Sequence, residues 1–225
     1  SPSNPHGSVA SLDYLKEAIL LARKYNFILA VDECYCDIFR MNRPKPPGAL
    51  EAAASLGKGL DNLIIFNSLS KRSNASGMRA GFIAGDKNVI ESYKLLVSNG
   101  ASPVPIPIQK VAASLYADEE HHTKACIHYD KNFSIVEKYL KPFYKDFKLP
   151  DAGFFLWLKV RDDQQAAKIL WNKFSLRVMP GSFMGIDVQG FNPGKGFLRI
   201  SLVDNKEVIE EAMKRIQLFL QSEIS

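Results

Sequence analysis

The chain has 225 residues, 46% of them hydrophobic, which is enough to bury a substantial core in one or two domains. Its 29 basic and 24 acidic residues give a net charge of +5 without a basic block, which argues against a nucleic-acid partner, and no apolar run is long enough to span a membrane. Without such a run or a signal peptide, we expect a cytoplasmic globular protein. The three cysteines form no CxxC pair, so we expect neither a disulfide framework nor a zinc site.

The first segment combines a turn with a helix. Two prolines, Asn4 and Gly7 give residues 1–7 the composition of a turn. Apolar residues then recur at helical spacing over residues 12–22, and Ser11 before them is a plausible N-cap.

Two apolar runs, residues 27–31 and 63–66, predict strands that are buried on both faces. Asp32 follows the first run, and Lys71 comes shortly after the second. Because the strand–helix–strand order is typical of parallel sheets, both side chains should lie at the sheet edge where ligands bind. Taken alone, an aspartate here is more often a turn former, and a lysine is usually just solvated.

Hydroxyl groups and a guanidinium surround this lysine in the sequence. Ser68 and Ser70, with the fork of Arg79, could hold a phosphate. The glycines that precede the lysine of a nucleotide P-loop are absent. Residues 80–85 predict a third strand, with Arg79 at its start. An amine beside a phosphate site suggests a cofactor that carries both an aldehyde and a phosphate.

The middle of the chain offers little chemistry. Three prolines in residues 102–107 predict an extended segment that leads to a helix near Gln109. His121, His122 and His128 lie in a polar helical region, where solvated side chains are expected rather than metal ligands.

A change of pattern predicts two domains, residues 1–132 and residues 133–225, the second a small α+β domain. Its strand over residues 197–202 places Arg199 between apolar neighbours, where an unpaired charge would be costly. Arg199 therefore needs an anionic partner, and both a structural salt bridge and a bound ligand remain open.

Four motifs together resemble the class I/II aminotransferases of the fold-type I pyridoxal-phosphate (PLP) superfamily, over essentially the whole chain. In order they are Asn4-Pro5-His6-Gly7, Asp32-Glu33-Cys34-Tyr35, Ser68-Leu69-Ser70-Lys71 with Arg79, and Leu198-Arg199-Ile200-Ser201. His6 stands where the family usually has threonine. The resemblance implies an aspartate-aminotransferase-like α/β fold, with a mostly parallel sheet in the large domain and a small α+β domain.

The resemblance also implies roles around the cofactor ring. Lys71 would bond covalently to PLP and move a proton at the substrate's α-carbon. Asp32 would pair with the pyridine nitrogen, which makes the ring an electron sink. Tyr35 and Asn4 would hydrogen-bond the ring's O3′.

The remaining motif residues would bind the two anionic groups. Ser68 and Arg79 would hold the phosphate, with Ser70 as a helper. Arg199 would bind the substrate's α-carboxylate through both arms of its guanidinium, and Asn4 would also contact the substrate.

Two stretches, residues 70–74 and 192–203, look most like the N-succinyldiaminopimelate aminotransferases within this family. That likeness implies glutamate as amino donor and N-succinyl-2-amino-6-oxopimelate as a possible acceptor, in lysine and diaminopimelate synthesis. Aspartate, LL-diaminopimelate and aromatic aminotransferases remain open. So do a PLP-dependent C–S β-lyase and a non-catalytic sensing module.

The sequence begins at Ser1. By the resemblance, the family's glycine-rich turn, its ring-stacking aromatic residue and a tyrosine from the neighbouring subunit would precede that residue. We therefore expect the C-terminal part of a homodimeric enzyme, a part that binds PLP poorly by itself and is inactive.

Overall fold

The computed structural model describes residues 1–100 and 103–224, and these form two compact units. Unit 1 comprises residues 1–3 and 8–126, and unit 2 comprises residues 4–7 and 127–225. The division falls inside helix α6 (Glu120–Leu140). The predicted boundary at 132/133 lies in the same helix and stays a prediction. Across the described residues, every helix is too short or too polar to cross a bilayer.

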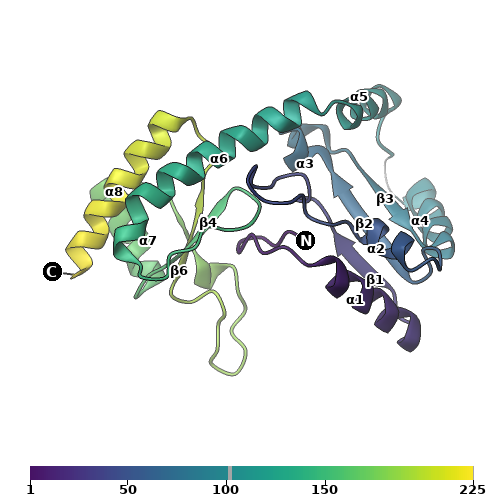
Figure 1. Cartoon of the computed structure of the whole chain (residues 1–225), viewed down its shortest axis with the longest axis horizontal. Helices are drawn as coiled ribbons and strands as arrows, with labels where there is room; N and C mark the ends of the chain where they lie inside the picture. The colour runs from purple at the N-terminus through teal and green to yellow at the C-terminus, as the bar shows by residue number, and fades with distance from the viewer. Residues whose placement is uncertain (101–102, 225) are drawn as a thin grey trace. The chain divides into compact units, whose positions relative to one another are not determined.

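Unit 1 contains a three-stranded sheet in the order β1-β2-β3 (Figure 1). Its strands are β1 (Leu29–Asp32), β2 (Leu63–Ser68) and β3 (Gly81–Gly85). Strands β1 and β2 are parallel, as the strand–helix–strand pattern predicted, whereas β3 runs antiparallel to β2. The sheet of unit 1 is therefore mixed, and the expectation of a mostly parallel sheet holds for one of its two pairings.

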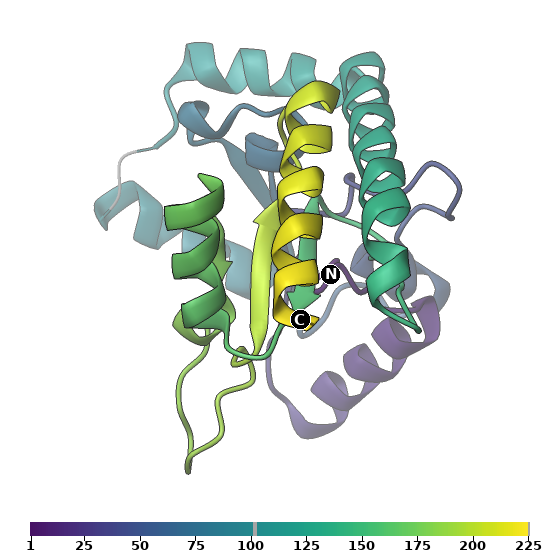
Figure 2. The ribbon, with the colours of Figure 1, turned by 90° about the vertical axis from the view of Figure 1, so that its left-hand side faces the viewer.

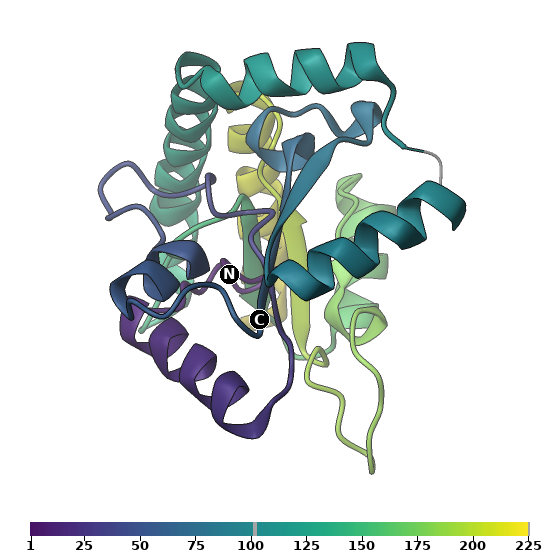
Figure 3. The ribbon, with the colours of Figure 1, turned by 90° about the vertical axis from the view of Figure 1, so that its right-hand side faces the viewer.

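Helices α1 and α2 pack against the sheet of unit 1 with small and branched side chains. Ser11 caps α1, as predicted, because its hydroxyl accepts a hydrogen bond from the backbone of Tyr14 at 3.1 Å. Helices α1 and α2 pack together, and their buried residues share a core with Val31, Leu63 and Ile65 (Figure 3). The helical segments are α1 (Leu12–Tyr25), α2 (Ala49–Ser55), α3 (Leu69–Arg72), η1 (Ser76–Met78), α4 (Lys87–Gly100) and α5 (Ile106–Ala117).

Helix α5 begins earlier than the sequence predicted. Residues 102–107 were expected to be extended, but Ile106 and Pro107 form the first helical turn after Pro105 as N-cap. A proline is compatible with this position because the first-turn amides have no partner within the helix. Ser102 lies outside the described residues.

Unit 2 places three helices on one side of an antiparallel sheet in the order β4-β6-β5 (Figure 2). Alternation divides the strands: Leu198 and Ile200 are buried, whereas Arg199 between them is partly exposed on the other face. The buried core also includes Phe133 of α6 and Phe219 of α8. The further segments are η2 (Lys141–Phe143), β4 (Phe155–Lys159), α7 (Asp163–Phe174), β5 (Met179–Pro180), η3 (Gly181–Phe183), β6 (Phe197–Ser201) and α8 (Lys206–Ile224).

Candidate active site

The carboxyl ends of β1 and β2 carry the predicted acid and amine of unit 1. Asp32 is the last residue of β1 and lies opposite Phe66 in the parallel register. Strand β2 ends two residues later, at Ser68, and Lys71 follows in the short helix α3. The structure therefore brings Asp32 and Lys71 to the same end of two neighbouring strands.

The side chains of Lys71 and Tyr35 lie close together. The Nζ atom of Lys71 is 5.7 Å from the centroid of the Tyr35 ring. The charges of Asp32 and Lys71 both act on the thiol of Cys34. Burial, together with the hydrogen bond and the charge of Asp32, raises the pKa of its thiol to about 12, while the Lys71 ammonium acts in the opposite direction. The thiol therefore stays protonated near neutral pH and is not a candidate nucleophile.

The two predicted serines form one hydrogen-bonded unit at the start of α3. The Ser68 hydroxyl accepts from the backbone of Ser70 at 3.1 Å and donates to the Ser70 hydroxyl at 2.9 Å. Both residues are partly exposed, and Ser68 caps the helical turn that carries Lys71. Their hydroxyls are thereby fixed beside the lysine.

Arg79 lies just before β3 rather than in it. Its backbone is left-handed, with φ at 51°, which ends the helical turn η1, and its guanidinium donates to the Ser76 carbonyl at 3.0 Å. The pairing of Gly81 with Ser68 brings this region beside the end of β2. The sequence prediction that Arg79 starts the strand was therefore two residues early, because a left-handed residue does not continue a pleated strand.

Arg199 lies in the middle of β6 in unit 2, where it is paired across the sheet with Trp157 and Met179. Its guanidinium carbon lies 4.6 Å from the centroid of the Phe155 ring, and its Nη1 donates to Asn4 Oδ1 at 3.3 Å. Among the residues that the structure describes, no carboxylate pairs with it. The structural salt bridge that the sequence left open is thus not observed in this part of the chain.

The turn that holds Asn4 is fixed against the strands of unit 2. The ring of His6 meets the ring of Trp157 edge-on at 5.6 Å, and the Gly7 carbonyl accepts from Ala152 at 3.0 Å. Gly7 has a φ of 68°, and a Cβ there would lie 2.3 Å from the Ala152 carbonyl oxygen. Only glycine fits this close approach, which places Asn4 within reach of Arg199.

The prediction that the three histidines are solvated was wrong for His122. This side chain is 4% exposed and hydrogen-bonds the Asp37 carbonyl, because α6 packs over the turn that follows β1. His121 contacts the Ser73 hydroxyl at 2.8 Å, and His128 contacts the Val203 carbonyl at 3.2 Å.

Sequence reasoning also missed two polar residues near the site. Asn67 shares the buried face of β2 with Ile65 and is bonded to the Tyr116 hydroxyl at 3.0 Å. Arg72, directly after Lys71, is 3% exposed. The available signal for Asn67 was its place in the alternation, since a polar residue on a buried face requires a partner.

The chemistry of these side chains fits pyridoxal phosphate. Unit 1 offers an amine for an aldehyde, a carboxylate for a ring nitrogen, and a phenol for a ring oxygen. Two serine hydroxyls and the guanidinium of Arg79 suit a phosphate. Unit 2 offers Arg199, which suits a carboxylate and has no such partner among the described residues of the chain.

Comparison with known proteins identifies the family. A family model described as aminotransferase class I and II matches residues 1–216. The fold is similar to an aminotransferase from Neisseria meningitidis Z2491, with a TM-score of 0.89 and 41% identity over 97% of this chain and 56% of that one. It is also similar to a probable N-succinyldiaminopimelate aminotransferase from Thermus thermophilus, with a TM-score of 0.82 and 27% identity over 97% of this chain and 56% of that one.

A curated relative gives the same result at the level of sequence. LL-diaminopimelate aminotransferase 2 of Nostoc sp. is 29% identical over 220 residues, which cover 96% of this chain and 54% of the relative. The chain thus spans about half the length of the relatives that it matches. The predicted family and its α/β fold are confirmed: the chain belongs to the class I and II aminotransferases.

Proposed function

We propose that this chain carries the lysine-bearing part of a PLP-dependent aminotransferase, which moves an amino group between an amino acid and a 2-oxo acid. One observation supports this most directly. Asp32 ends one of two neighbouring parallel strands and the Lys71 turn follows the other, with the Lys71 amine 5.7 Å from the Tyr35 ring. Ligands of open α/β sheets bind at this end of the strands.

The proposed roles at the ring follow from the chemistry of each side chain. PLP, when bound, supplies an aldehyde for covalent attachment and an electron-withdrawing ring. Lys71 would hold the cofactor through its amine and would move a proton at the substrate's α-carbon. Asp32 accepts a hydrogen bond from the ring nitrogen and keeps it protonated. Tyr35 and Asn4 hydrogen-bond the ring oxygen.

The proposed anion contacts use the remaining residues. Ser68 and Ser70 donate hydroxyl hydrogens to the phosphate, and Arg79 neutralises part of its charge. Arg199 binds the α-carboxylate of the substrate, and its contact with the Phe155 ring keeps the guanidinium plane oriented. Asn4, at 3.3 Å from Arg199, steadies one arm of the guanidinium and contacts the substrate.

The proposed substrates belong to diaminopimelate synthesis. Two of the similar proteins are named as aminotransferases of LL-diaminopimelate and N-succinyldiaminopimelate. On this support we propose glutamate as amino donor and N-succinyl-2-amino-6-oxopimelate as acceptor, in a cytoplasmic homodimer.

The proposal is tested by the site at which PLP attaches. The 225-residue chain is incubated with excess PLP, reduced with borohydride and digested, and the modified lysines are located by mass spectrometry. We expect preferential modification of Lys71, because Asp32 and the serine–arginine group would orient the aldehyde toward it. Excess cofactor makes the readout independent of tight binding.

Matched variants separate a site from general lysine reactivity. Lys71→Arg should abolish the preferential label, and Asp32→Asn should reduce it. Lys87→Arg, at the exposed first residue of α4, should leave the labelling of Lys71 unchanged. Equal labelling of Lys71 and Lys87 in the unmodified chain would refute the proposed cofactor site.

A further inference from the structure

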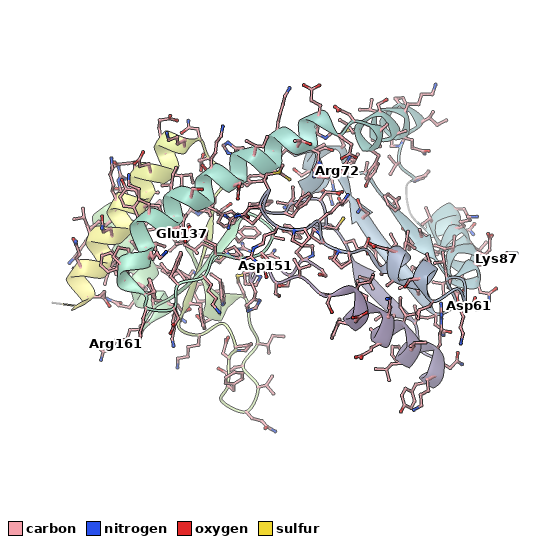
Figure 4. All side chains as sticks on the ribbon, viewed as in Figure 1. Asp61, Arg72, Lys87, Glu137, Asp151 and Arg161 are labelled. Carbon is pink, nitrogen blue, oxygen red and sulfur yellow. The ribbon has the colours of Figure 1, made fainter. Side chains whose placement is uncertain are left out.

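Arg72 is a buried cation directly beside the proposed catalytic lysine. Its side chain is 4% exposed, although arginine is rarely buried without partners (Figure 4). The residue ends α3, the short helix that also contains Lys71. The backbone of that turn therefore cannot move without moving Arg72.

The guanidinium of Arg72 joins three segments of unit 1. Its Nη1 lies 3.4 Å from Asp37 Oδ2, in the turn after β1. Its Nη2 donates to Glu119 Oε1 at 2.8 Å and to the carbonyls of Tyr116 and Asp118 at 3.2 and 3.3 Å. One side chain thus connects α3, the β1 turn and the segment between α5 and α6.

The turn that Asp37 closes contains Tyr35 and comes directly after Asp32, the last residue of β1. Backbone hydrogen bonds from Cys36 to Glu33 at 3.1 Å and from Ile38 to Tyr35 at 2.9 Å give it a fixed shape. Helix α6 holds the same turn from the other side, because the Asp37 carbonyl also accepts from Cys126 Sγ at 3.2 Å. Asp37 therefore connects Arg72 to the turn after β1.

A second contact ties the end of α3 to the start of α6. His121 Nε2 lies 2.8 Å from the Ser73 hydroxyl, and His121 Nδ1 lies 2.9 Å from Asp118 Oδ2. The lysine-bearing turn is thus held by the segment before α6 through Arg72, and by α6 itself through Ser73.

We propose that Arg72 is a positioning residue that locks the turn carrying Lys71 to the turn that contains Tyr35 and follows Asp32. This inference rests on the proposed function, because its consequence is that the Lys71 amine is held in place relative to Asp32, the carboxylate proposed to bind the cofactor. The planar fork of arginine reaches acceptors on several segments at once, whereas a lysine ammonium is a single point charge and serves fewer of them. Displacement of a reacting group by about 1 Å costs up to about a hundredfold in rate.

Arg23 provides a matched control. It also donates to backbone carbonyls, those of Gly59 at 2.8 Å and Asp61 at 3.3 Å, and so joins α1 to the loop before β2. That loop precedes β2, whereas Lys71 follows it. Arg23→Met therefore removes hydrogen bonds to two backbone carbonyls, as Arg72→Met does, without touching the proposed site.

The first measurement is hydrogen exchange of the 225-residue chain without cofactor. Arg72→Met should speed exchange in peptides covering residues 33–40 and 68–78 together, and Arg72→Lys should do so less. Arg23→Met should speed exchange around residues 57–63 only. Should Arg72→Met fail to fold, Arg72→Lys and Glu119→Gln carry the same comparison, since the Glu119 side chain is 67% exposed and its change is mild.

The second measurement is the concentration of PLP needed to label Lys71, fixed by borohydride and located by mass spectrometry. We expect Arg72→Met to raise it by about tenfold or more, Arg72→Lys to give an intermediate value, and Arg23→Met to leave it unchanged.

The outcomes separate the two proposals. Unchanged exchange in both segments, or an unchanged PLP requirement in Arg72→Met, overturns the role of Arg72. Faster exchange in both segments with no preferential label on Lys71 in the unmodified chain supports the lock between the turns and rejects the proposed function.

Discussion

Arg199 lies in a strand and contacts the side-chain amide of Asn4 at 3.3 Å and the Phe155 ring, whose centroid is 4.6 Å from the guanidinium carbon. Neither contact neutralises its charge. An arginine stacked on a ring keeps its charge and most of its donors available for a planar anion. The local structure therefore suits a residue that receives a carboxylate from outside the chain.

We expect Arg199→Lys to weaken the binding of 2-oxoglutarate, used as a probe carboxylate, by about tenfold or more. The lysine ammonium cannot make two parallel hydrogen bonds to one carboxylate, nor stack on the Phe155 ring in the same way. Isothermal titration calorimetry on the chain in excess PLP measures the change. Arg177→Lys, at an exposed position of unit 2, is the control and should bind the probe unchanged. Equal affinities in all three proteins would show that Arg199 does not bind the carboxylate.

The sequence could predict individual residues where the cause is local. Asp32 and Lys71 come after apolar runs, and that placement located them at one end of the sheet. The first run was wrongly predicted to be buried on both faces, since β1 begins only at Leu29 and Val31 is its one buried residue. Arg72 could not be assigned a role in this way. Its partner Glu119 lies 47 positions later, and nothing in the residues around Arg72 indicates which segment will cover it. His122 was misjudged for the same reason, since its burial depends on the turn that holds Asp37.

At the scale of elements, apolar runs and helix caps predicted that a strand or helix forms better than they predicted the direction in which a strand runs. The run at residues 63–66 became β2, and Ser11 caps α1. The antiparallel course of β3 was not predicted, because its apolar residues would suit either direction. The connection between the two strands contains only the short helical turns α3 and η1 rather than a full crossover helix, and the chain turns back beside β2.

Asp86 joins two elements of unit 1 and gives a prediction that depends on pH. One carboxylate oxygen accepts from Asn88 at 2.8 Å and Val89 at 3.3 Å in the first turn of α4, and the other accepts from Asn62 at 2.9 Å before β2. These backbone hydrogen bonds, that of Asn62 first, hold the pKa of Asp86 below its usual 3.8.

We expect Asp86→Ala to lower the free energy of unfolding by about 1 kcal/mol at neutral pH, as for the loss of a helix cap. Because the folded-state pKa is lowered, the carboxylate stabilises fully above the unfolded pKa, and its contribution is lost as pH falls through the folded pKa. The difference between the two proteins should therefore shrink below the usual pKa of 3.8. Urea unfolding at neutral and acidic pH measures it. Asp13→Ala, whose side chain is 88% exposed, should change little, and a pH-independent loss in Asp86→Ala would contradict the assignment.

At the scale of the whole molecule, the two units have separate hydrophobic cores. The core of unit 1 joins α1 and α2 to β1 and β2, and the core of unit 2 joins the sheet β4-β6-β5 to α6, α7 and α8. The two clusters share no residue. Helix α6 connects the two units along the chain: Cys126 is hydrogen-bonded within unit 1, and Phe133 is buried in the core of unit 2.

Because the cores are separate, we expect each unit to lose its protection against hydrogen exchange independently of the other. Leu170 is fully buried in unit 2, and Leu170→Ala should destabilise that unit by about 2–5 kcal/mol through lost burial and a residual cavity. Hydrogen exchange in β4 and β6 should become faster, while exchange in β1 and β2 stays as in the unmodified chain. Ile65→Ala, at a position 1% exposed in unit 1, should give the reverse pattern. If either substitution accelerates exchange equally in both sheets, the chain unfolds as one cooperative body, and α6 transmits the loss of one core to the other.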